Sequence, residues 1–203
     1  MKRVLRLVSL GTIAVTTATT VLSQDFDDAE AAKNYFAEEA KEWKARLERI
    51  RNALADDNDV ILKEEIFNLA SMIGYTGIHV DALQGLLDAG EIPPERVAKI
   101  LKNVIQTGLP ILKEAPDKDV AKRNKAFHDV FLTVTFLQTI PSEDTLTLLK
   151  EISVSNEKRI RKATIETTGK IITKLEEKKQ PADVEKFATF LKEMKQAEGK
   201  REN

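Results

Sequence analysis

Apolar residues at helical spacing run through nearly the whole chain beyond residue 26, and this spacing restricts the fold more than any other feature of the sequence. From Asp27 to Leu54 the apolar residues recur at intervals of four, three, four, three and four, which places them on one stripe of an α-helix. These residues are Phe36, Ala40, Trp43, Leu47, Ile50 and Leu54. No later segment shows the alternation typical of a half-buried strand. The sequence therefore predicts an all-α protein.

Capping and turn-forming residues divide the rest of the chain into short helices. Asp56-Asp57-Asn58-Asp59 interrupts the first helix and offers N-cap side chains for the second. Gly108 is expected to end a helix, and Asp117 to cap the next long one. Helices are expected at about 60–73, 79–89, 94–108, 117–137, 142–154, 156–176 and 181–197, with a brief apolar element at 109–115. Short helices joined by tight turns fold either as stacked antiparallel pairs or as a compact bundle.

The first residues of the chain have the order of regions that an export signal requires. Lys2, Arg3 and Arg6 form a basic start, and the run Leu7–Leu22 that follows carries no charge. This run is shorter than the ~20 apolar residues that span a bilayer. We therefore expect residues 1–23 to be a cleaved signal peptide and the protein to be periplasmic or secreted. An uncleaved N-terminal membrane anchor and an organelle transit peptide are the alternatives.

The expected mature chain is large enough for a single domain. We expect one α-helical domain at 24–198, made of an N-terminal amphipathic helix at 24–56 and helix-pair repeats at 57–198, with a disordered tail at 199–203. The sequence has no cysteine, which excludes disulfides, thiol catalysis and lipid attachment through cysteine. Residues 1–23 hold three of the 32 basic residues and no acidic ones, so 29 basic residues face 33 acidic ones afterwards. This balance favours solubility and gives no reason to expect nucleic-acid binding.

Short similar strings recur in the second half of the chain. Residues 109–114, 146–151 and 189–193 each place Leu-Lys-Glu at the end of an apolar run, and their lysines are 37 and 42 residues apart. This spacing is near the period of two-helix solenoid repeats. Arg123 and Arg161 each stand near the start of the longer helix that follows the first two strings.

The segment Ile160-Arg161-Lys162-Ala163-Thr164 resembles the second helix of a HEAT-like repeat, and the match is centred on residues 145–172. Gly169 also matches the family pattern, whereas Thr164 stands where the family prefers alanine and Thr168 where it has leucine. The resemblance implies stacked helix pairs that bind other macromolecules, with no catalytic residues. It also implies that Arg123 and Arg161 hold equivalent places in successive units. The alternative is that both are solvated first-turn residues.

The sequence lacks the motifs that carry common enzyme chemistry. It has no glycine-rich phosphate loop, no nucleophile elbow and no zinc-protease motif. Its two histidines, His79 and His128, are 49 residues apart. We therefore predict no catalytic residue, no metal and no cofactor.

A run of basic residues is the one candidate binding site. Lys158, Arg159, Arg161 and Lys162 lie in the first turns of an expected helix, where cations are mildly unfavourable. We interpret them, together with Arg123, as possible partner-binding residues. The other interpretation is ion pairing with a neighbouring helix.

These observations favour an exported, non-catalytic α-helical protein that acts as a protein-binding scaffold or adaptor. It is expected to bind a protein partner and no nucleic acid, and to have no stable membrane span after cleavage. One alternative is a helical bundle that holds an apolar small ligand near Phe127, Phe131 and Val134. Another is an enzyme that uses scattered residues such as Tyr75 and has no recognisable motif.

Overall fold

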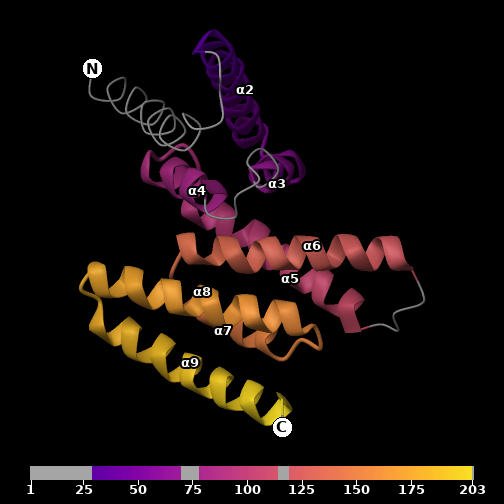
Figure 1. Ribbon diagram of the computed structural model, residues 1–203, viewed down its shortest axis with the longest axis vertical. Helices are drawn as coiled ribbons and strands as arrows, with labels where there is room; N and C mark the ends of the chain where they lie inside the picture. Colours follow the sequence, from indigo (N-terminus) through magenta and orange to yellow (C-terminus); the bar gives the residue numbers. More distant parts are fainter. Residues whose placement is uncertain (1–28, 70–77, 114–118, 203) are drawn as a thin grey trace. The chain divides into compact units, whose positions relative to one another are not determined.

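The computed structural model describes residues 29–69, 78–113 and 119–202, and within them every regular element is helical (Figure 1). The α-helices are α2 (Ala29–Ala55), α3 (Asp59–Asn68), α4 (Ile78–Asp88), α5 (Pro94–Lys113), α6 (Val120–Phe136), α7 (Glu143–Ser153), α8 (Lys158–Glu177) and α9 (Pro181–Glu202). A 3-10 turn, η1, covers Leu137–Thr139. The predicted all-α class is confirmed. The expected signal peptide at 1–23 lies outside the described residues.

The contacts within the chain divide it into two compact units. The first unit contains α2, α3 and Gln84–Ile92, and the second contains Leu69–Leu83 and everything from Pro93 onward. Among the described helices, none combines the length and the apolar composition that a membrane-spanning segment requires.

The first unit is built on the contact between α2 and α3. Ile50 of the predicted stripe is fully buried, as are Leu62 and Ile66 of α3. Two arginines of α2 also reach Glu65, whose side chain is only 8% exposed. Arg49 Nε donates to Glu65 Oε1 at 2.6 Å, and Arg46 Nη1 donates to the Glu65 carbonyl at 3.3 Å. Burial lowers the pKa of Arg46, and the charge of Glu65 opposes this effect.

The predicted break between the first two helices is confirmed. The Asn58 side-chain oxygen accepts from the amides of Val60 and Ile61, both at 3.2 Å. This contact satisfies two of the amides that the start of α3 leaves without helical partners. Asp57 takes the left-handed conformation, with φ of 53°.

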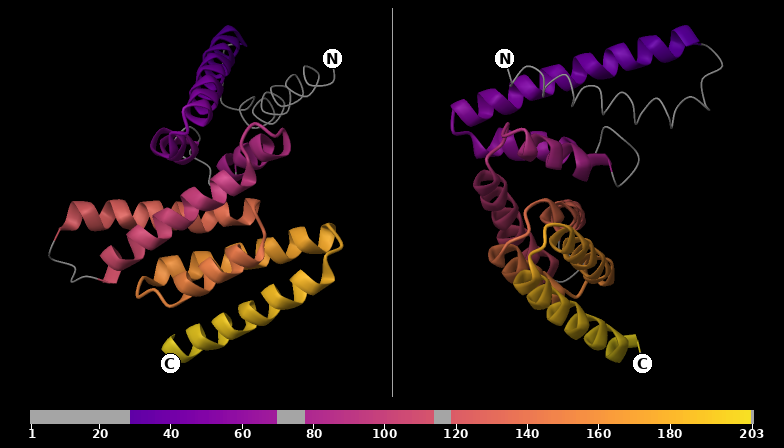
Figure 2. Two further views of the ribbon diagram at one scale, coloured as in Figure 1. Left: turned by 180° about the vertical axis from the view of Figure 1, so that it is seen from behind. Right: turned by 90° about the vertical axis from the view of Figure 1, so that its left-hand side faces the viewer.

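The second unit continues as antiparallel helix pairs. In Figure 1, α6 and α8 run side by side in one direction, and α7 and α9 run in the opposite direction. Figure 2 shows the same rows from behind. Helix α5 packs on α6, and α7 packs on α8. The fully buried side chains of these helices include Ile105, Val130, Phe136, Leu149, Ile160 and Ile171.

Helix α5 extends past Gly108 to Lys113, so the predicted helix end at Gly108 and the separate element at 109–115 are wrong. The buried side chains of Leu109 and Leu112 extend the apolar face of the helix through Pro110. Gly108 has a packing role instead. A Cβ added there would lie 2.6 Å from Cγ2 of Val130, so only glycine lets α5 approach α6 this closely.

Two other predicted boundaries differ from the structure. Helix α6 begins at Val120 and is capped by the Asp119 side chain, which accepts from the Lys122 amide at 2.9 Å. Asp117, the predicted cap, lies outside the described residues. Helix α9 continues to Glu202, beyond its predicted end at Ala197 and into the segment expected to be a disordered tail. Tertiary contact explains this extension, because Glu198 is buried against α8.

Two threonines of α8 occupy the positions where the HEAT-like pattern has alanine and leucine. Thr164 and Thr168 are both fully buried. Their hydroxyls donate to the carbonyls of Ile160 and Thr164, at 2.8 and 2.7 Å. The polar groups are thereby satisfied within the helix, so the threonines are tolerated in the interior.

Candidate functional site

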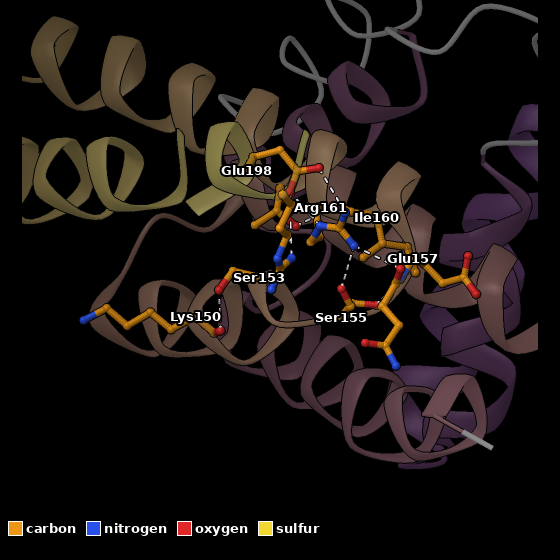
Figure 3. A network of polar contacts seen from close by, with 10 residues as sticks. Lys150, Ser153, Ser155, Glu157, Ile160, Arg161 and Glu198 are labelled. Carbon is orange, nitrogen blue, oxygen red and sulfur yellow. Dashed lines mark hydrogen bonds and ion pairs between the residues drawn. The ribbon is translucent and has the colours of Figure 1, made fainter. Parts of the chain in front are cut away.

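The basic run at the start of α8 contains one arginine that is held by the protein itself. Arg161 Nε and Nη2 donate to the two carboxylate oxygens of Glu198 on α9, at 2.7 and 3.0 Å. Its Nη1 donates to the carbonyls of Ser155 and Asn156, both at 3.0 Å. Figure 3 shows Arg161 between Glu198 and the turn that leads from α7 into α8. This bidentate geometry is the strongest arrangement of an arginine with a carboxylate.

The same contacts set the charge state of Glu198. The hydrogen bonds from Arg161 lower the pKa of this carboxyl group, burial opposes the effect, and the charges of Arg161, Arg201 and Lys158 lower the pKa further. The side chains of Arg161 and Glu198 are 12% and 11% exposed. The pair is therefore ionised and almost enclosed, and it joins the first turn of α8 to the last turns of α9.

Arg123 has the same register in α6 as Arg161 has in α8. The Arg123 amide donates to the carbonyl of Asp119, the N-cap of its helix, and the Arg161 amide donates to that of Glu157, the N-cap of α8. Arg123 Nη1 also donates to the carbonyl of Leu112 near the end of α5, at 2.9 Å. Its Nη2 pairs with the carboxylate of Glu157. Each arginine thus binds a backbone carbonyl that precedes its own helix and a carboxylate that follows it in the sequence.

The remaining members of the basic run face the solvent. Lys158, Arg159 and Lys162 are exposed on the first two turns of α8. Glu157, the N-cap residue, makes no side-chain capping bond. Of the five predicted partner-binding residues, the structure brings Lys158, Arg159 and Lys162 together on one helix end, and places Arg123 and Arg161 in ion pairs within the second unit.

A groove of about 170 Å³ lies beside this helix end. It is lined by the end of α7, by Arg161 and Ile165 of α8, and by one face of α9. The contributing residues are Ser153, Val154, Arg161, Ile165, Phe190, Glu193, Met194, Ala197, Glu198 and Arg201. Val154 is 61% exposed and is one of the few large apolar side chains of the described residues that face the solvent. The Arg161–Glu198 pair thus forms part of a surface that combines apolar and charged groups.

The other candidate residues lie apart from this groove. The His128 side chain is 69% exposed on α6, and the side chain of His79 is outside the described ones. Among the described residues, no three His, Asp or Glu side chains are grouped so that they could hold a metal ion. Phe127 and Phe131 stack on each other with ring centroids 6.1 Å apart, and Val134 is buried.

Sequence reasoning missed Glu198 and the groove. Glu198 fell near the expected end of a frayed helix, 37 residues from Arg161, and no local pattern connects the two. The available signal was the misfit of a cation in the first turn of a helix, which pointed to an ion pair with a neighbouring helix. The structure identifies that neighbour as α9.

Comparisons of the chain with protein-family models, with curated proteins and with solved structures gave no match in any of the three cases.

Proposed function

We propose that this chain is an exported, non-catalytic helical scaffold that binds another protein. The observation that carries the proposal is the repeated arginine arrangement of the second unit. Arg123 and Arg161 stand 38 residues apart at the same register, and each binds a carbonyl of the preceding segment and a carboxylate of the following one. Such repetition is expected when one helix-pair unit is used again, and repeats of this kind form extended binding surfaces.

The contacts between helices support stacking of these pairs over a closed bundle. In the described part of the second unit, α5 packs on α6 and α7, α6 packs on α8, α7 packs on α8, and α9 packs mainly on α8 with a small contact to α7. Each pair thus meets its neighbour along the chain. A closed bundle would also place α9 firmly against α5 or α6. Solenoids end in a unit with a polar outer face, and α9 buries Phe187, Phe190 and Met194 while most of its other side chains are exposed.

The exposed cations at the start of α8 are the proposed contact with the partner. Lys158, Arg159 and Lys162 are exposed near the N-terminus of α8, where the helix dipole makes cations mildly unfavourable. The chain as a whole has a formal net charge of −1, so its field does not favour nucleic acid. A protein surface with negative charges is the partner that this local charge favours.

Export makes a direct prediction about the mature polypeptide. When the full chain is expressed with a functional secretion pathway, residues 1–23 are expected to be removed, so that the mature protein begins at Gln24. Intact-mass measurement of the protein in the extracytoplasmic fraction tests this result. Inserting two arginines into the apolar run Leu7–Leu22 should keep the chain in the cytoplasm. Recovery of the unprocessed chain in the membrane would instead indicate an anchor.

Protein binding is tested by affinity capture from the natural source of the chain. The unaltered protein is expected to recover one partner reproducibly, and the double variant Arg159→Glu, Lys162→Glu is expected to lose it. The same reversal at Lys192 and Lys195, which are exposed on α9, is the matched control and should retain the partner. Carboxylates near a helix N-terminus are favourable, so the first variant should remain folded. If the unaltered protein enriches nothing above background, the scaffold proposal fails.

A further inference from the structure

The groove beside α8 has apolar walls that reach the solvent. Val154 stands at its mouth from the end of α7, and Ile165 lines it from α8. On α9, residues 190, 194, 197 and 201 recur at helical spacing and form the opposite wall. Apolar cavities of about 150 Å³ hold a benzene molecule, so about 170 Å³ leaves room for one apolar side chain.

The lining of the groove holds two arginines and two glutamates, and two lysines on the adjacent part of α8 make the charge around it positive. Glu198 is held by the bidentate contact of Arg161 and also lies near Arg201, whose Nη1 is 3.8 Å from Glu198 Oε2. Lys158 and Lys162 lie on the same face of α8 as Ile165, three to seven residues before it, and Arg201 lines the groove from α9. Glu193 is the one lining carboxylate besides Glu198. An approaching segment therefore meets an apolar slot with cations on both of its sides.

From this arrangement we infer that the groove receives one apolar side chain of an acidic segment of the protein partner. The inference rests on the proposed scaffold function and names the chemistry of the partner at this site. The apolar side chain is expected to contact Val154, Ile165 and Met194, and the flanking carboxylates to meet Lys158, Lys162 and Arg201. Carboxylates that approach these cations are expected to orient the segment and to raise the association rate. The enclosed apolar side chain is expected to provide most of the affinity.

The shape of the groove favours a protein segment over a lipid surface. The volume admits one short side chain, whereas acyl chains need long apolar clefts or broad amphipathic faces. The exposed surface of α9 next to the groove is mostly charged and polar, which does not suit burial in a bilayer. The cations alone would attract either surface, so the test must vary the apolar side chain and the charge separately.

The test uses the protein purified after expression of the full chain, without further truncation. The probe is a short synthetic peptide with one leucine flanked by aspartates. We expect saturable binding by fluorescence anisotropy at low salt, weakening as salt is raised. Replacing the peptide leucine with alanine should weaken binding about tenfold or more, because the buried apolar area is lost. Replacing its aspartates with lysines should abolish binding.

Variants of the protein locate the binding to the groove. Ala197 is exposed and lines the groove, so Ala197→Trp fills the slot without altering the interior. Gln196→Trp places the same bulk on the neighbouring exposed position and is the matched control. We expect Ala197→Trp and Lys162→Glu each to weaken peptide binding about tenfold, and Gln196→Trp and Lys192→Glu to leave it unchanged.

Each contrary result identifies a different error. Absence of peptide binding, binding that is insensitive to the leucine, or equal binding by Ala197→Trp overturns the inference. Binding to vesicles of phosphatidylglycerol with phosphatidylcholine but not to the peptide assigns the surface to a membrane. Self-association that Ala197→Trp abolishes in analytical ultracentrifugation assigns it to a second copy. If affinity capture recovers a partner that Ala197→Trp still binds, the scaffold proposal stands and the groove assignment fails.

Discussion

Arg161→Met is expected to lower the free energy of unfolding of the second unit by about 3 kcal/mol, because it removes one member of an enclosed ion pair. The variant loses both contacts to Glu198 and both backbone contacts at the start of α8. Methionine keeps most of the apolar stem but leaves Glu198 ionised and 11% exposed with its main partner gone. Urea denaturation followed by circular dichroism measures the change.

The double variant Arg161→Met, Glu198→Leu separates the cost of the unpaired charge from the loss of the pair. Replacing both members of a buried pair with apolar side chains is often nearly neutral, so the double variant should recover much of the stability. Arg161→Lys should fall between the unaltered protein and Arg161→Met, since an ammonium group cannot span both carboxylate oxygens. If Arg161→Met alone costs nothing, the pair does not hold α9 on α8.

The pH dependence of stability gives an independent test of the contact between Arg161 and Glu198. The pKa of Glu198 is lowered in the folded protein from its ordinary value of 4.5, mainly by the hydrogen bonds from Arg161. The stability that this shift contributes is present above the ordinary pKa and is lost as pH falls through the folded pKa. The difference between the unaltered protein and Arg161→Met should therefore be largest near neutral pH and shrink as the pH falls below 4.5 and through the lowered pKa of Glu198.

The course of the helices was largely predictable, because it depends on local spacing and on caps. The helix that contains Ile50, the break at Asn58 and the start of α9 at Pro181 are all visible in the sequence and present in the structure. The division into two units was not predictable, because α4 contributes to both and no change of composition marks the division. Residue spacing and capping residues depend on neighbours along the chain, whereas the compact units are defined by contacts between segments that are distant in the sequence.

The candidate site was predictable only in part, for the same reason. The basic run was recognised from its residue types. The sequence did not show, however, that its adjacent residues Arg161 and Lys162 have different surroundings. One is turned toward Glu198, and the other is exposed. Which of the two is enclosed depends on where α9 lies across α8. A cation in the first turn of a helix indicates a need for a negatively charged neighbour, and this holds equally for another protein and for α9.

Gly108 shows how one residue type supports two interpretations. Its replacement by alanine is expected to have the second large effect on stability. Glycine usually marks a helix end, but here it lies inside α5 because α6 approaches the backbone. In Gly108→Ala the new Cβ would lie 2.6 Å from Cγ2 of Val130, a fully buried β-branched side chain with little rotamer freedom. Overpacking of this kind costs about 2 to 3 kcal/mol, and the better helix propensity of alanine offsets about 1.

Gly169 offers the matched control for this substitution. It also lies inside a helix, α8, and a Cβ added there would meet nothing within 4 Å. Gly169→Ala is therefore expected to stabilise the protein by up to about 1 kcal/mol, and Gly108→Ala to destabilise it by about 1 to 2 kcal/mol. Adding Val130→Ala to Gly108→Ala removes the clashing methyl groups, so the two changes should be coupled by about 1 kcal/mol or more in a double-mutant cycle. Equal effects of the alanine substitution at both glycines would show that α5 and α6 do not approach each other at Gly108.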